Sequence, residues 1–166
     1  MIRIEPITVE KVALYKSTRL AALQDMPTAF GSTYAKESQL SDQDWIKRVA
    51  QWNGERSIAR LAMDDDQPCG IAAGFFEQSD PRAATLVSMW VAPSHRKLGV
   101  GRMLVDTIFN WVAANNGTHL NLLVTCSNDI AIRFYERLGF KMTGKTEPYP
   151  NDPKLIEYEM VRLVVC

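Results

Sequence analysis

The sequence MWVAPSHRKLGVGR (residues 89–102) decides how the chain is interpreted, because it runs from an apolar strand through a basic loop into a helix. A helix start presents unpaired backbone N–H groups and a partial positive charge, and both favour a bound anion. Gly99 and Gly101 carry no side chain that would block the anion's approach, and Arg96, Lys97 and Arg102 add positive charge around the same point. The stretch therefore predicts a phosphate-binding loop, although the two glycines could also serve only a tight strand-to-helix turn.

Two familiar phosphate-binding loops do not fit this stretch. A P-loop needs GxxxxGK followed by Ser or Thr, which is missing. A dinucleotide fingerprint GxGxxG would begin at Gly99, but Leu104 stands where its third glycine belongs. A dinucleotide-binding module is therefore a remote alternative, and the pattern that remains is Arg96-x-x-Gly99-x-Gly101.

The composition of the 166-residue chain fits one domain without net charge. Lys and Arg total 19, Asp and Glu also total 19, and 46% of the residues are hydrophobic. A chain of this length can bury a core without help from disulfides or metals. Zero net charge removes the global attraction on which non-specific nucleic-acid binding depends. We therefore expect a single domain over residues 1–166 that binds anions by local geometry and has no nucleic-acid partner.

The cysteines and the N-terminus indicate where such a protein works. Cys69, Cys126 and Cys166 are widely spaced, with no CxxC and only two histidines in the chain, which predicts reduced thiols and no metal site. Glu5 and Pro6 interrupt the region where a signal peptide has its apolar core, and no stretch approaches the ~18 apolar residues of a membrane span. We expect a soluble cytoplasmic protein without a membrane partner.

Hydrophobic periodicity predicts an alternating order of strands and helices. Strands are expected at residues 2–7, 57–63, 69–78, 84–92, 119–126, 140–145 and 154–163, and helices at 9–23, 41–52, 102–116 and 128–138. Thr8 is a candidate cap for the first helix, Ser41 with Asp44 resembles a capping box, and the turn-rich EPYPNDP (147–153) separates the last two strands. The order β-α-α-β-β-β-α-β-α-β-β predicts an α/β fold whose mixed sheet begins with antiparallel hairpins and gains a parallel pair later.

The glycine loop and a second segment together resemble a known family. The pattern Arg96-x-x-Gly99-x-Gly101 looks like motif A of the GCN5-related N-acetyltransferases (GNAT). NDIAIRFYERLGFKMTG (128–144) is similar to the family's next motif, and AFGSTYAKES (29–38) is similar to a segment of many small-molecule members. The resemblance implies a GNAT-like mixed seven-stranded sheet flanked by about four helices.

The same resemblance implies acetyl-coenzyme A as co-substrate and assigns roles to particular residues. The pyrophosphate is expected on Arg96 and on backbone N–H groups of residues 98–102, and the pantetheine arm beside the strand at 89–91, where a backbone N–H near Val91 polarises the thioester. Tyr135 is implied as the general acid for the leaving thiolate. The implied cofactor-binding residues are Met89, Trp90, Val91, Arg96, Lys97, Leu98, Gly99, Val100, Gly101, Arg102 and Asn128, and the implied catalytic residue is Tyr135.

Plainer interpretations exist for the same side chains. Tyr135 shares a helical face with Phe134 and Leu138 and could be only a core aromatic residue. Asn128 could be only a helix cap. Trp90 is the tryptophan expected near the cofactor, whereas His95 is expected on the loop surface rather than as a base.

The general base is left open by the sequence. Some family members place an acidic residue or His on the strand before motif A, but TLVSM (85–89) contains neither. Glu37, Glu77, Glu157 and Glu159 are candidates by segment, while a water chain or an amine that arrives neutral needs none of them.

The sequence predicts an N-acetyltransferase that moves an acetyl group from acetyl-coenzyme A to a primary amine by direct transfer, without metal. The alternative is a non-catalytic acyl-coenzyme A-binding or sensing domain of the same fold, which the missing acidic residue favours. The acceptor is open among small-molecule and peptide amines. Homodimers are frequent in the family, so a homodimer is one expectation, although no segment specifies its interface.

Overall fold

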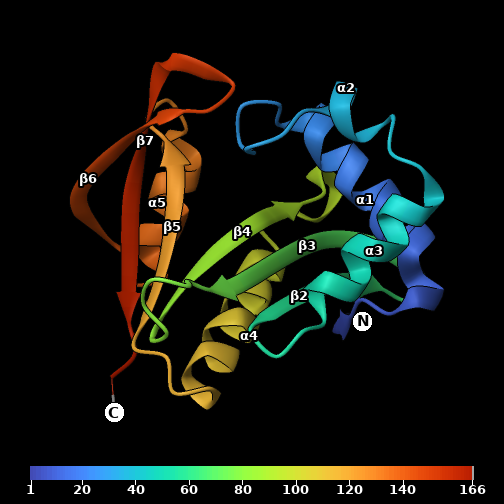
Figure 1. The fold of residues 1–166 in the computed structure, drawn as a ribbon, viewed down its shortest axis with the longest axis horizontal. Coiled ribbons are helices and arrows are strands. Elements are labelled where there is room, and N and C mark those ends of the chain that lie inside the picture. Colours follow the sequence, from blue (N-terminus) through green and yellow to red (C-terminus); the bar gives the residue numbers. More distant parts are fainter. Residues whose placement is uncertain (166) are drawn as a thin grey trace.

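The computed structural model describes residues 1–165 as a twisted seven-stranded sheet with helices on both faces (Figure 1). Cys166, one of the three expected thiols, lies outside the described residues, and Cys69 and Cys126 are free cysteines. No helix among the described residues is long and apolar enough to cross a membrane. Within residues 1–165, no group of three His, Cys, Asp or Glu side chains could hold a metal ion.

The strands lie in the order β1-β2-β3-β4-β5-β7-β6, which confirms the predicted mixed sheet. All neighbouring pairs are antiparallel except β4 with β5, which is parallel. The strands are β1 (Ile2–Pro6), β2 (Ser57–Asp64), β3 (Gln67–Phe76), β4 (Ala83–Val91), β5 (His119–Thr125), β6 (Lys141–Tyr149) and β7 (Asp152–Leu163).

The parallel pair is short, and its two strands then diverge. β4 and β5 are in register only at Ala83–His119, Ala84–Leu120 and Thr85–Asn121, so the rest of each strand has no partner on that side. β4 also has an irregular register against β3 beyond Val87, and Ser88 there takes a positive φ of 58°. The sheet therefore opens into a V toward the carboxyl ends of β4 and β5 (Figure 1).

The first helical region differs from the expected single helix. A 3-10 turn, η1 (Val9–Lys11), precedes α1 (Val12–Asp25), and the Thr8 side chain makes no cap hydrogen bond, so the predicted Thr8 cap is wrong. α1 ends at Asp25, two residues beyond the expected Leu23 but still ahead of Met26 and Pro27, because the residue before a proline is disfavoured in a helix.

Two further helices follow before the sheet resumes. α2 (Tyr34–Glu37) is a single turn that the periodicity did not predict, because four residues are too few to show a helical pattern. α3 (Asp42–Trp52) begins at the predicted capping box. There Asp44 N donates to Ser41 Oγ at 3.2 Å, and Ser41 N donates to Asp44 Oδ2 at 3.0 Å.

Residues in left-handed conformation lie at the start of α4 (Val100–Ala114) and shortly after the ends of α4 and α5 (Asp129–Arg137). After η2 (Pro93–His95), α4 starts at Val100 rather than the expected Arg102, because Gly99 at φ 85° already caps it. Asn116 at φ 65° follows the end of this helix, and Gly139 at φ 95° follows α5.

The segment EPYPNDP is mostly strand rather than turn. β6 continues to Tyr149 and β7 begins at Asp152, so only Pro150 and Asn151 separate them. The expected strand ends at 145 and 154 are therefore wrong, because pairing between the two strands overrides the turn propensity of Pro and Asp.

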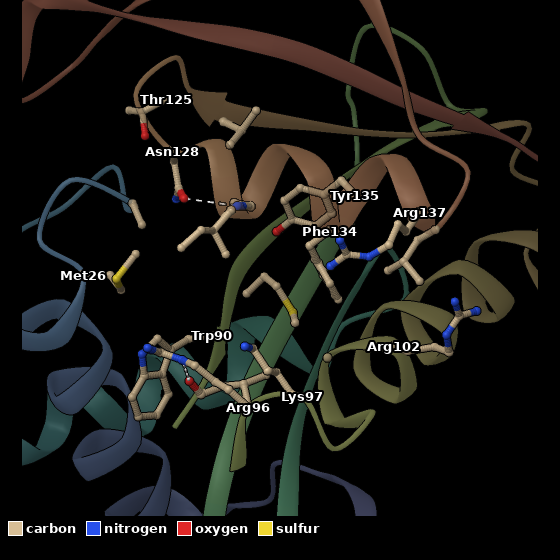
Figure 2. Close-up of a pocket in the computed structure, with 18 of the residues that line it drawn as sticks. Met26, Trp90, Arg96, Lys97, Arg102, Thr125, Asn128, Phe134, Tyr135 and Arg137 are labelled. Atoms are coloured by element: carbon tan, nitrogen blue, oxygen red, sulfur yellow. Dashed lines mark hydrogen bonds between the residues drawn. The ribbon is translucent and has the colours of Figure 1, made fainter. Parts of the chain in front are cut away.

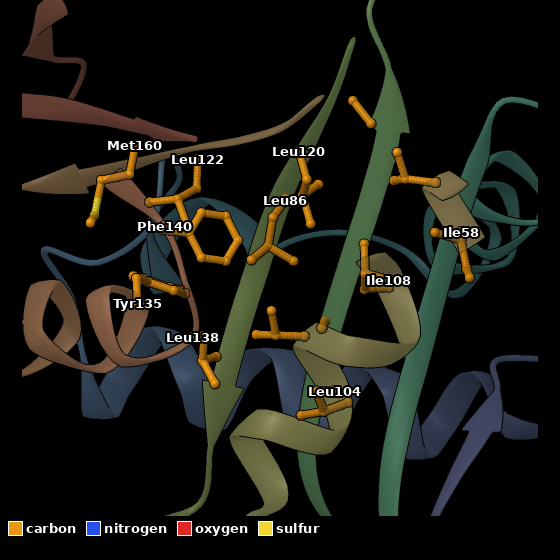
Figure 3. Packing of buried hydrophobic residues seen from close by; sticks show 14 of the residues in the cluster. Ile58, Leu86, Leu104, Ile108, Leu120, Leu122, Tyr135, Leu138, Phe140 and Met160 are labelled. Atoms are coloured by element: carbon orange, nitrogen blue, oxygen red, sulfur yellow. The ribbon is translucent and has the colours of Figure 1, made fainter. Parts of the chain in front are cut away.

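Two hydrophobic clusters fill the two faces of the sheet. On one face, Leu104 and Ile108 of α4 and Tyr135 of α5 pack against Leu86, Leu120 and neighbouring strand residues (Figure 3). On the other face, Tyr15 of α1 and Trp45 of α3 pack against Leu61, Ile71 and Trp90. Since both faces are covered, the exposed ends of β4 and β5 are left as the place where a ligand can enter.

Candidate active site

A cleft of about 620 Å³ lies where β4 and β5 diverge (Figure 2). Its walls come from β4, the β4–α4 loop, the end of β5, α5 and the loop between α1 and α2. Most of the residues that the sequence singled out line it together: Met89, Trp90, Val91, Arg96, Lys97, Gly99, Gly101, Arg102, Asn128 and Tyr135.

Two of the predicted cofactor-binding residues do not line the cleft. The Leu98 side chain points outward and is 66% exposed, whereas Val100 is 1% exposed and belongs to the hydrophobic core. The role expected of both residues depends on their backbone N–H groups, and it stays a prediction.

Structural reasons exist for both glycines of the loop. Gly99 has open space around its α-carbon and is required by its positive φ. Gly101 lies in the first turn of α4, where an added Cβ would come within 2.8 Å of Phe134 Cζ and 3.3 Å of Met89 Cε. Gly101 thus lets α5 approach the start of α4 closely, and both helices then border the same cleft.

One end of the cleft is basic. Lys97 and Arg102 lie there as expected, and Figure 2 shows Arg137 of α5 extending toward the same region. Arg137 was not predicted from the sequence, because the pattern of its helix indicates only which residues form the apolar face. Arg96 is already engaged: its Nε donates to the Val91 carbonyl at 3.1 Å and its guanidinium forms an ion pair with Asp25.

The wall formed by β4 has a free edge. The pairing with β5 ends at Thr85, so Met89–Val91 have no strand partner on the cleft side. Trp90 lines the cleft, but its indole packs into the opposite core and donates from Nε1 to Asp25 Oδ2 at 2.9 Å. Asp25 therefore holds both Trp90 and Arg96 at the end of α1.

His95 does not have the surface position expected of it. Its side chain is only 17% exposed, lines the cleft, and lies with Nε2 2.9 Å from Asp64 Oδ2. The hydrogen bond to His95 lowers the pKa of the Asp64 carboxyl below its ordinary value. This contact ties the β4–α4 loop to the end of β2.

Tyr135 lies on α5 between two aromatic rings. Its ring meets Phe134 at 5.2 Å and Phe140 at 5.6 Å in edge-to-face geometry, and the residue is 9% exposed. Burial raises the pKa of Tyr135 well above its ordinary value of 10, so the phenol stays protonated at neutral pH. Tyr135 is thus a core aromatic residue that also lines the cleft (Figure 2), and its role as general acid stays a prediction.

Asn128 caps α5, as its plain interpretation predicts. Its Oδ1 accepts a hydrogen bond from the Ala131 N–H at 3.2 Å (Figure 2). None of the residues 1–165 accepts a hydrogen bond from the Asn128 side-chain amide nitrogen, which lines the cleft with two N–H donors available.

The other end of the cleft is formed by the α1–α2 loop and β5. Met26 and Phe30 face Leu123 and Thr125 there, and the Thr125 hydroxyl donates to the Thr28 carbonyl at 3.4 Å. The walls are mainly apolar at this end, in contrast to the basic end.

The β6–β7 hairpin braces this loop from the opposite arm of the V. The Tyr149 hydroxyl lies 3.2 Å from the Pro27 carbonyl and also contacts that of Phe30. Asn151 Nδ2 donates to the carbonyls of Phe30 and Ser32, each at 3.3 Å. This brace was not predicted from the sequence, because the turn-forming residues of EPYPNDP gave no sign of contacts with a distant loop.

The four candidate bases lie in different places. Glu37 is buried between two arginines, and Glu77 accepts from the Thr85 hydroxyl at the closed end of the V. Glu157 and Glu159 lie on β7 and pair with Thr125 and Leu123 of β5, which line the cleft. Cross-strand partners project to the same face of a sheet, so the two carboxylates are on the cleft side. Burial, with the nearby Glu147 carboxylate, raises the pKa of Glu157.

Residues 20–140 match the model of the acetyltransferase (GNAT) family. The chain belongs to this family. The fold agrees, since a GNAT acetyltransferase from Streptococcus pneumoniae superposes with a TM-score of 0.82 at 19% identity over 99% of this chain and 100% of that chain. PaiA N-acetyltransferase from Thermoplasma acidophilum, solved in complex with coenzyme A, gives a TM-score of 0.78 at 14% identity over 99% of both chains.

Sequence relatives of this GNAT protein bear diverse names. It is 31% identical over 110 residues to naa20, the N-terminal acetyltransferase B complex catalytic subunit of Schizosaccharomyces pombe, a match that covers 66% of this chain. It is 34% identical over 89 residues to streptothricin acetyltransferase of Streptomyces lavendulae, which covers 54% of this chain. The chain spans only 61% and 46% of the length of these two relatives.

Proposed function

We propose that this GNAT protein transfers the acetyl group of acetyl-coenzyme A to a primary amine by direct attack, without a covalent acyl-enzyme. The observation that carries the proposal is the cleft between β4 and β5, which joins a basic helix start to a protonated tyrosine. The family membership supports acetyl-coenzyme A as the donor.

The residues of the cleft fit the parts of that donor. Lys97, Arg102 and Arg137 supply positive charge for phosphate groups, and the start of α4 supplies backbone N–H groups. The free edge of β4 at Met89–Val91 offers hydrogen bonds to the amides of a pantetheine arm, as a sheet edge does to an added strand. The thioester supplies an activated acyl group and a thiolate leaving group.

The chain's own groups then serve the transfer. As the amine nitrogen bonds to the carbonyl carbon, a backbone N–H near Val91 stabilises the negative charge on oxygen. The C–S bond breaks, its electron pair goes to sulfur, and Tyr135 donates its proton there. The amine loses its proton to water or to a carboxylate, for which Glu157 and Glu159 are candidates because they pair across the sheet with the cleft-lining Thr125 and Leu123. Holding both reactants in line can contribute about 7–11 kcal/mol, more than the proton transfers.

The acceptor class is a small-molecule or peptide amine. The names of the two relatives do not decide between these classes: one is an N-terminal acetyltransferase subunit and the other is a streptothricin acetyltransferase. Four expectations stay predictions of the sequence: the cytoplasmic location, the homodimer, the single domain over residues 1–166 and the absence of a metal requirement.

The test is mass spectrometry of a reaction of the full chain with acetyl-coenzyme A and a broad panel of amines. We expect at least one amine to gain an acetyl group, and the melting temperature of the chain to rise with coenzyme A. If no amine is acetylated and coenzyme A leaves the melting temperature unchanged, the proposal is wrong.

A non-catalytic coenzyme-binding domain is the second candidate, because β4 carries no acidic residue and Glu37 is engaged by arginines. Binding of acetyl-coenzyme A without turnover of any amine in the panel, together with unchanged binding by Tyr135→Phe, is the result that favours it.

A further inference from the structure

A second cavity, of about 280 Å³, lies beside the cleft on the sheet face covered by α1 and α3. Unlike the apolar end of the cleft, it is lined mostly by residues with polar or charged side chains. The lining residues are Tyr15, Arg19, Ser32, Glu37, Arg48, Gln51, Trp52 and Ser88.

The charged groups of this second cavity leave one positive charge in excess. Arg19 and Arg48 contribute two positive charges, and Glu37, whose side chain is 2% exposed, contributes one negative charge. No other Lys, Arg, Asp or Glu lines the cavity. A partly buried excess of positive charge favours an anionic group.

Arg19 and Arg48 differ in how many of their guanidinium N–H groups already donate hydrogen bonds within the protein. Arg19 donates from Nε and Nη2 to the two Glu37 oxygens, each at 3.0 Å, and from Nη1 to Ser88 Oγ at 3.3 Å. Arg48 donates from Nη1 alone to Glu37, at 2.6 Å, and its side chain is 30% exposed. Arg48 therefore retains guanidinium N–H groups for a further acceptor, in a fork that suits a carboxylate.

Helix α3 aligns further groups beside Arg48. Gln51 and Trp52 follow Arg48 at the i+3 and i+4 positions, so the three side chains share the helix face that lines the cavity. Gln51 adds amide N–H donors next to the guanidinium. Arg48 itself is fixed, since its guanidinium lies 5.1 Å from the Trp45 ring.

The second cavity adjoins the acceptor end of the cleft. Phe30 lines the cleft while Ser32, on the same loop, lines the cavity, and Ser88 of the cavity directly precedes Met89 of the cleft. Between them the Arg19 guanidinium lies over the Phe30 ring at 5.0 Å. The two cavities therefore lie on either side of the Arg19–Phe30 contact, and an acceptor that occupies both has to extend past it.

We propose that the second cavity binds a carboxylate of the acceptor, so that the amine that is acetylated belongs to an amino carboxylate. The inference rests on the proposed acetyl transfer and narrows its acceptor from amines in general to those that carry a carboxylate. Arg48 and Gln51 are its binding residues, and the Arg19–Glu37 pair holds Arg48 in place.

The experiment compares each of a series of amino carboxylates, from α-amino acids to longer ω-amino acids, with its own primary amide. With acetyl-coenzyme A in excess, we expect kcat/KM to be about 10- to 100-fold higher for at least one carboxylate than for its amide. Arg48→Gln is expected to remove that preference and to leave the KM for acetyl-coenzyme A unchanged. Lys47→Gln is the matched control, because Lys47 is exposed on the same helix and its loss changes the charge equally.

A binding readout keeps the inference separate from the proposed function. Calorimetric titration of the wild-type chain with the amino carboxylates is expected to give binding that Arg48→Gln abolishes and Lys47→Gln preserves. Transfer to amides or to simple amines that equals or exceeds transfer to the carboxylates would overturn the inference while leaving the acetyltransferase proposal intact. If Arg48→Gln folds poorly, the ratio of kcat/KM for each carboxylate to that for its amide, measured with the wild-type chain, still tests the inference.

Discussion

Tyr135 combines burial with access to the cleft, which gives it one testable chemical role. Phe at this position keeps the edge-to-face contacts with Phe134 and Phe140 and removes the hydroxyl group that carries the proton. We expect Tyr135→Phe to lower kcat, measured by the release of the coenzyme A thiol, about 10²- to 10⁴-fold. The melting temperature is expected to stay unchanged. Because the pKa of Tyr135 is raised by burial, the phenol stays protonated, and kcat is not expected to fall between pH 7 and about pH 10. An unchanged kcat would make it a core residue only.

Glu157 differs from the other candidate bases in the direction of its pKa shift. Burial and the Glu147 carboxylate raise its pKa, so the base becomes ionised, and kcat/KM rises, at higher pH than for an ordinary carboxyl. We expect Glu157→Gln to abolish that ascending limb of the pH profile and Glu159→Gln to preserve it. If both variants keep the ascending limb, neither glutamate is the general base, and the amine loses its proton to a water chain or arrives already neutral.

At the scale of elements, α4 and α5 pack closely at residue 101, which has no side chain. Gly101→Ala places a Cβ 2.8 Å from Phe134 Cζ and 3.3 Å from Met89 Cε, so the Phe134 ring has to move. We expect a loss of about 1–3 kcal/mol in the free energy of unfolding and weaker binding of coenzyme A, measured by urea denaturation and calorimetry. Gly31→Ala is the control, since no atom lies within 4 Å of its added Cβ. Equal effects of the two variants would contradict this account.

The three N-terminal helices are joined at Glu37 of α2, which forms ion pairs with Arg19 of α1 and Arg48 of α3. The strength of these ion pairs depends on pH. Burial acts to raise the pKa of Glu37, but the hydrogen bond and charge of Arg19, with Ser32 and Arg48, outweigh it and leave the pKa below its ordinary 4.5. The stabilisation is therefore complete above about pH 4.5 and is lost as the pH falls through the lower folded pKa.

Removal of the Glu37 carboxylate leaves two arginines without their partner. We expect Glu37→Gln to lower the free energy of unfolding at pH 7 by about 3–5 kcal/mol, and the loss to shrink as the wild-type chain is acidified. Urea denaturation of both proteins from pH 7 to pH 3 measures this. A pH-independent difference would show that the ion pair is not the cause.

At the scale of the whole molecule, the two arms of the open sheet are connected by the brace from Tyr149 to the α1–α2 loop. Tyr149→Phe removes the hydroxyl contacts with Pro27 and Phe30 but keeps the buried ring. We expect the KM of the acceptor to rise several-fold while the KM of acetyl-coenzyme A stays unchanged, with a stability loss of about 1 kcal/mol. Steady-state kinetics with each substrate varied in turn checks this, and a rise confined to the coenzyme KM would contradict it.

Features that depend on neighbours in sequence were predictable. The spans of β2 and β4, to within one residue at each end, the Ser41–Asp44 box and the end of α1 shortly before Pro27 all follow from interactions within a few residues, and they were predicted correctly. The glycine loop was recognisable for the same reason, since its charges, glycines and helix start are contiguous.

Features that depend on packing were not predictable from the chain alone. The hydroxyl of Tyr149 meets a carbonyl 119 residues away, the Arg19–Glu37 pair spans 18 residues, and Arg137 reaches the basic end of the cleft from another helix. Periodicity reports only which face of an element is apolar. Where β4 and β5 part, and hence which side chains share a cavity, is set by the twist of the assembled sheet and the helices packed on its two faces.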